Sequence, residues 1–106
     1  IGELWNWLQS QDQYRDQTTL IITCDHGRGS SENDFWQSHG EKIKGSDQTW
    51  LAIIGPDTPK SGEIKVPGQI YNNQVAMTIA SLLKIDYKNP VAGKSIITTN
   101  NKTFSY

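Results

Sequence analysis

The chain has 106 residues, of which 35% are hydrophobic, and its formal net charge at pH 7 is −1. Charges of both signs are scattered along it, which argues against a nucleic-acid partner or an anionic membrane surface. No apolar run approaches the ~20 residues of a transmembrane helix. A single cysteine excludes an internal disulfide. The length allows at most one domain, and an amphipathic pattern begins at once, so we expect residues 1–106 to be a single domain or a fragment.

The first expected elements are a helix and a strand. Ile1, Leu4, Trp5 and Leu8 have the i, i+3, i+4, i+7 spacing of one helical face, which predicts a helix running to about Tyr14. Residues 18–24 then form an apolar run rich in Ile and Thr. Such a run predicts an inner parallel strand, buried on both faces.

A long polar segment separates this strand from the next one. Residues 25–47 are rich in Gly and Ser and show little periodicity, and loops of this length are usually functional or disordered. Phe35 and Trp36 are the expected apolar anchors within it. Residues 49–54 form a second apolar run that stops at Gly55-Pro56, which predicts a second inner strand.

The second half of the chain predicts one helix and one strand. Asn72 or Asn73 is suited to cap a helix that runs to about Lys84. Its expected buried positions are apolar: Val75, Ala76, Ile79, Ala80, Leu82 and Leu83. Residues 95–99 are a plausible strand. The order helix, strand, long loop, strand, helix is typical of an α/β protein.

Two histidines mark the candidate site. The first strand ends in Asp25-His26-Gly27, and His39 precedes Gly40. Ligand sites in open α/β sheets lie at the carboxyl ends of strands, and a carboxylate with an imidazole suits a zinc-like ion. We therefore expect Asp25, His26 and His39 to converge at one end of the sheet. The alternative is turn chemistry at Asp25-His26 and a surface role for His39.

Three elements taken together resemble a known family. Asp25-His26-Gly27, His39-Gly40 and the segment 73–83, NQVAMTIASLL, are similar to the C-terminal part of the alkaline phosphatase superfamily. The resemblance extends over residues 18–93. It implies an α/β fold, namely the C-terminal part of a three-layer sandwich with a mostly parallel sheet and helices packed on it.

The resemblance also implies a chemistry. It matches Asp25 and His26 to the ligands of the metal beside the nucleophile, and His39 to a ligand of a second metal, with zinc or manganese expected. The reaction would be metal-dependent hydrolysis of a small-molecule phosphate mono- or diester. The nucleophile and the remaining ligands would come from upstream sequence, so we expect the fragment alone to be inactive. Arg28 either orients a substrate phosphate or forms an ordinary loop salt bridge.

Two alternatives stay open at this stage. The first is a fragment of a sulfatase, which shares the fold but usually binds one calcium; His26 favours the two-metal branch because calcium prefers oxygen ligands. The second is a non-catalytic module with vestigial ligands. The resemblance makes a periplasmic or extracellular location plausible, and inner strands without their neighbours predict self-association.

Overall fold

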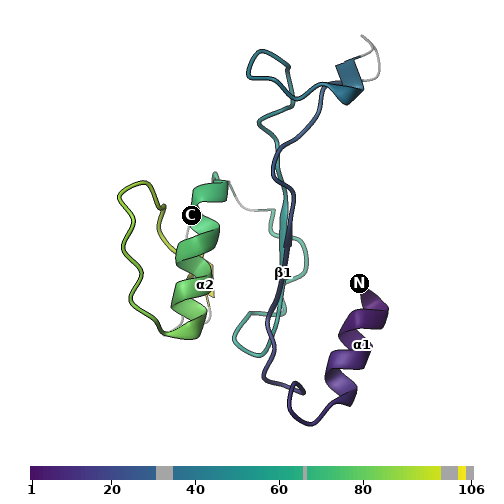
Figure 1. The fold of residues 1–106 in the computed structure, drawn as a ribbon, viewed down its shortest axis with the longest axis vertical. Helices are drawn as coiled ribbons and strands as arrows, with labels where there is room; N and C mark the ends of the chain where they lie inside the picture. The colour runs from purple at the N-terminus through teal and green to yellow at the C-terminus, as the bar shows by residue number, and fades with distance from the viewer. Residues whose placement is uncertain (31–34, 66, 99–102, 105–106) are drawn as a thin grey trace. The chain divides into compact units, whose positions relative to one another are not determined.

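A computed structural model describes residues 1–30, 35–65, 67–98 and 103–104. The chain divides into two compact units, one formed by residues 1–19 and 54–106 and the other by residues 20–53. Figure 1 shows the helices and the long paired segments around the first strand. In chain order the elements are α1 (Gly2–Ser10), β1 (Leu20–Thr23), η2 (Phe35–Gln37), β2 (Leu51–Ile54), η3 (Asn72–Gln74), α2 (Val75–Leu83), β3 (Ile97–Thr98) and β4 (Thr103–Phe104).

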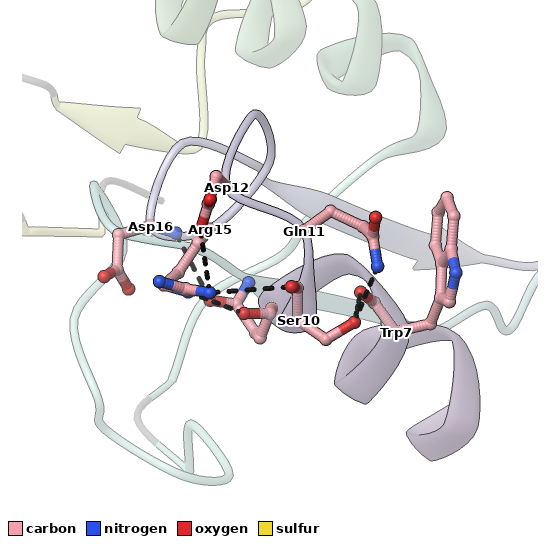
Figure 2. A network of polar contacts seen from close by, with 7 residues as sticks. Trp7, Ser10, Gln11, Asp12, Arg15 and Asp16 are labelled. Atoms are coloured by element: carbon pink, nitrogen blue, oxygen red, sulfur yellow. Dashed lines mark hydrogen bonds and ion pairs between the residues drawn. The ribbon is translucent and has the colours of Figure 1, made fainter.

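Helix α1 ends four residues earlier than the sequence predicts. Gln11 has extended backbone angles and ends the helix after Ser10. Arg15 then folds back over this end: its Nε donates to the carbonyl oxygen of Gln9 at 2.9 Å, and its guanidinium pairs with Asp12 at 3.0 Å (Figure 2). A helix leaves its last carbonyl groups without partners. The guanidinium supplies one, and positive charge at this end is also favoured by the helix dipole.

Strands β1 and β2 are hydrogen-bonded neighbours in a two-stranded sheet. From the last residue of β1 onward, residues later in the first segment bond to residues earlier in the second. Thr23 Oγ1 donates to the carbonyl of Trp50 at 2.8 Å, and Gly27 N donates to the carbonyl of Ser46 at 2.8 Å. The two segments therefore run antiparallel here, and the mostly parallel sheet that the sequence predicts stays a prediction. In both strands the first three residues are half-buried and the last is exposed, so burial on both faces, which was expected for inner strands of a larger sheet, stays a prediction.

The predicted second helix is present as η3 followed by α2. Its N-cap is Tyr71 rather than Asn72 or Asn73, because the Gln74 side chain reaches back and accepts the Tyr71 N–H at 2.8 Å. At the other end Lys84 adopts the left-handed conformation, with φ of 56° and ψ of 37°. Such a residue often ends a helix, although glycine is the usual choice there.

The buried face of α2 differs from the apolar face that the sequence predicts. Thr78 and Ala80 are buried, whereas Ile79 and Leu83 are 41% and 64% exposed. The Thr78 hydroxyl donates to the carbonyl of Gln74 at 2.8 Å and accepts the Ile96 N–H at 3.0 Å. This polar contact turns the Thr78 side of the helix toward the 93–97 segment, and Ile79 and Leu83 consequently face solvent, whereas Val75 and Leu82 are half-buried.

The core of the larger unit lies where α2 meets strand β3. Its buried apolar residues are Ala80, Ile96 and Ile97. Strand β3 pairs antiparallel with β4, with Ile97 opposite Phe104. The predicted strand 95–99 is thus present as β3, and Thr99 lies outside the described residues. Among the described residues no helix has the length and apolar character needed to cross a membrane. The larger, mostly parallel three-layer sandwich stays a prediction.

Candidate metal centre

The segment between β1 and β2 is folded by its own backbone, although the sequence shows no periodicity there. Three successive turns are closed by hydrogen bonds from Ile43 N to Gly40 O, from Ser46 N to Ile43 O and from Gln48 N to Gly45 O. A further bond of 3.1 Å joins Gly29 N to the carbonyl of Ser38. Because Ser38 precedes His39, this bond brings the second histidine back toward the first.

Asp25 and His26 form a local pair at the end of β1. The Asp25 carboxylate accepts the backbone N–H of His26 through Oδ1 at 2.9 Å. Its other oxygen, Oδ2, lies 3.6 Å from His26 Nε2. The Asp25 side chain is 87% exposed and that of His26 is 31% exposed. Two potential metal donors therefore lie side by side, and both are open to solvent.

The imidazole of His26 is oriented by its second nitrogen. Nδ1 lies 2.7 Å from the carbonyl oxygen of Gly27, and this contact requires the proton to be on Nδ1. In a neutral ring Nε2 then carries the lone pair, which is the arrangement of most metal-bound histidines, whose other nitrogen donates to a carbonyl or carboxylate.

The Nε2–Oδ2 separation fits a shared ion better than a hydrogen bond. At 3.6 Å the two atoms are too far apart for a good hydrogen bond. Two donors that each lie about 2.1 Å from a tetrahedral ion are about 3.4 Å apart. The separation lies within ion-pair range, and it also matches the spacing of two donors on one divalent ion.

The rings of His26 and His39 are stacked, with centroids 3.9 Å apart and planes 19° from parallel. The lone pair of an imidazole nitrogen lies in the plane of its ring, so an ion in the plane of one ring lies well off the plane of the other. Stacked rings cannot both bind one ion head-on. Each ring can instead bind its own ion through a nitrogen in its plane, and adjacent ions in two-metal sites are about 3.5–4 Å apart.

The donors do not form a closed set by themselves. Among the described residues no group of three or more His, Cys, Asp or Glu side chains is arranged to hold a metal ion. His39 and Arg28 are exposed. Trp36 is 52% exposed, so the prediction that it anchors the loop is wrong. The side chain of Phe35 lies outside what the structure describes. The metal roles of Asp25, His26 and His39, and the substrate role of Arg28, stay predictions.

Two glycines of the site make close backbone contacts that the sequence pattern does not predict. A Cβ on Gly27 would collide with the backbone carbonyl oxygens of Gly45 and Gln48. Gly45 has a φ of +95°, and a Cβ there would lie 2.7 Å from the carbonyl oxygen of Arg28. The two backbones therefore cross at a distance that only glycine permits. A glycine after a histidine is visible in the sequence, but its partner across the loop is not.

Comparison with known proteins gives no match to this chain among protein-family models, curated proteins or solved structures.

Proposed function

We propose that this chain contributes part of a two-metal centre to a metal-dependent hydrolase of phosphate mono- or diesters. In this proposal Asp25 and His26 hold one divalent ion, and His39 holds a second. Zinc or manganese is the expected metal, because imidazole suits these ions better than calcium. The nucleophile and the remaining ligands would be supplied by residues outside these 106.

The observation that carries the proposal is the stacking of His26 on His39 at 3.9 Å. Stacked rings that each face an ion are compatible with the ion spacing of phosphoryl-transfer sites. The Asp25–His26 separation of 3.6 Å adds a second donor for one of these ions.

Each residue would have a defined task in this chemistry. The carboxylate of Asp25 would offset positive charge on the first ion, and the Gly27 carbonyl would keep the His26 tautomer fixed. The ions would polarise the phosphoryl oxygens and stabilise the leaving oxygen. Arg28, two residues beyond His26 and exposed, is proposed to contact a substrate phosphate oxygen, for which a guanidinium has the matching geometry.

Metal binding by the chain can be tested with a paramagnetic ion, which reports even weak sites. The chain has only two histidines, so the imidazole proton signals can be assigned by substitution. We expect substoichiometric Mn²⁺ to broaden the ring signals of both histidines. Asp25→Asn should reduce this broadening at least tenfold, and Zn²⁺ should displace Mn²⁺ far better than Ca²⁺ does.

The matched control is Asp57→Asn, because Asp57 is also an exposed carboxylate next to a strand but lies in the other unit. It should leave the broadening unchanged. The proposal would be contradicted if Asp25→Asn did not reduce the broadening, or if Ca²⁺ displaced Mn²⁺ as well as Zn²⁺ does.

In the protein that carries the remaining ligands, Asp25→Asn should lower kcat/KM for an aryl phosphate by at least about 100-fold, since loss of even an outer-shell partner of a metal lowers affinity or activity 10–100-fold. An aryl sulfate as the preferred substrate would favour the sulfatase alternative.

A further inference from the structure

Ser46 contacts the residues that follow both histidines. Its carbonyl oxygen accepts the N–H of Gly27 at 2.8 Å, and Gly27 follows His26. Its hydroxyl lies 2.9 Å from the carbonyl oxygen of Gly40, and Gly40 follows His39. One residue is therefore hydrogen-bonded to both His-Gly pairs, through its main chain to the first and through its side chain to the second.

We propose that Ser46 is a positioning residue that sets the spacing of the His26 and His39 rings. The inference rests on the proposed function, because that spacing is what would separate the two ions. The other bonds of the 40–48 segment join residues three apart and fix only single turns. The Ser46 hydroxyl spans six residues to Gly40, and so it fixes the His39 end relative to the backbone that holds the His26 end.

The geometry identifies the hydroxyl as the group that matters. The same oxygen also lies 2.7 Å from the carbonyl of Ile43, so a single hydroxyl proton is shared between two carbonyl acceptors. Alanine removes both contacts, whereas threonine keeps the hydroxyl. Alanine at residue 46 leaves the Gly27–Ser46 bond in place, because that bond uses the main chain. The predicted defect is thus confined to the position of His39.

The test measures ring proximity directly, without metal in the sample. Nuclear Overhauser effects between the imidazole protons of His26 and His39 are compared in the wild type, Ser46→Ala and Ser46→Thr. Loss of one hydroxyl–carbonyl bond should lower the equilibrium constant between the stacked and unstacked arrangements about five- to tenfold. We expect the ring-to-ring effect to be present in the wild type, strongly weakened in Ser46→Ala and restored in Ser46→Thr.

Ser10→Ala is the matched control, because the Ser10 hydroxyl also donates to a backbone carbonyl, that of Trp7 at 2.7 Å, but in the other unit. It should leave the ring-to-ring effect intact. An undiminished effect in a folded Ser46→Ala variant, or its absence in the wild type, would overturn the inference. If the effect behaves as expected while Mn²⁺ fails to broaden the ring signals, Ser46 still positions the two imidazoles and it is the metal function that is refuted.

Discussion

Gly27→Ala tests whether the crossing of two backbones holds the candidate site together. The added methyl group would meet the carbonyl oxygens of Gly45 and Gln48, which are main-chain atoms and cannot rotate away. To make room, the 45–48 backbone must withdraw from Gly27. The 2.8 Å bond from Gly27 N to the Ser46 carbonyl is then stretched or broken, and the link between the two His-Gly pairs is lost.

The expected loss of stability in Gly27→Ala is the sum of two contributions, the steric overlap and the lost hydrogen bond. Overpacking of a close contact costs typically 1–3 kcal/mol, and a lost backbone hydrogen bond adds about 1 kcal/mol. The arrangement in which the Gly27 backbone lies against residues 45–48 should therefore be destabilised by about 2–4 kcal/mol. That corresponds to roughly a 30- to 700-fold smaller equilibrium constant for forming this arrangement, since 1.4 kcal/mol is a factor of ten.

Gly40→Ala is the matched control, because Gly40 also follows a histidine but has room for a side chain. The nearest atom to its added Cβ is Ile43 Cγ1 at 3.9 Å, and its φ is not positive. This variant should stay within about 0.5 kcal/mol of the wild type. The measurement is hydrogen exchange of the residue-27 amide, together with urea unfolding of both variants.

The reasoning would be refuted if Gly27→Ala were as stable as Gly40→Ala and kept its residue-27 amide equally protected. It would also fail if Gly27→Ala unfolded more easily but retained the full ring-to-ring effect between His26 and His39. In that case the crossing would contribute stability without setting the site geometry.

Two further predictions concern helix α2. Thr78→Val should leave the buried Ile96 N–H without an acceptor and lower the free energy of unfolding by about 1–3 kcal/mol. Thr78→Ser keeps the hydroxyl and should restore protection of the Ile96 amide in hydrogen exchange. Equal exchange of this amide in both variants would contradict the role of the Thr78 hydroxyl. Lys84→Gly should raise the free energy of unfolding by about 0.5–1 kcal/mol, because glycine adopts the left-handed conformation of residue 84 without a Cβ penalty. Lys84→Ala should bring no such gain in the urea midpoint, and an equal gain would show that the backbone conformation is not the cause.

Short-range patterns predicted which segments are helical or extended, but not where they end. The helical spacing of Leu4, Trp5 and Leu8 correctly indicated α1, and the Asn-rich start before residue 75 correctly indicated the second helix. The end of α1 depends on Arg15 folding back onto Gln9. Periodicity cannot reveal a contact of that kind, because the long side chain interacts with main-chain atoms rather than with an apolar face.

The candidate site was likewise predictable from the sequence only in part. The two His-Gly pairs were visible as residue types in one window, and the structure brings their rings together. Ser46 was not visible, since a serine in a polar loop has the same appearance whether or not its hydroxyl joins distant carbonyls. The buried face of α2 was predicted only in part: Ala80 is buried as predicted, but Thr78 is buried in place of Ile79, which hydropathy ranks higher. The paired acceptor and donor on Thr78 reverse that ranking.

The stacked histidines are contributed by a single uninterrupted stretch of chain, residues 20–53. The entropy cost of closing a loop grows only slowly with its length. The other unit, in contrast, must join residues 1–19 to residues 54–106 across the intervening stretch. Folding rates fall as contacts become more distant in sequence. The two imidazoles should therefore come together early in folding, before residues 1–19 have joined residues 54–106.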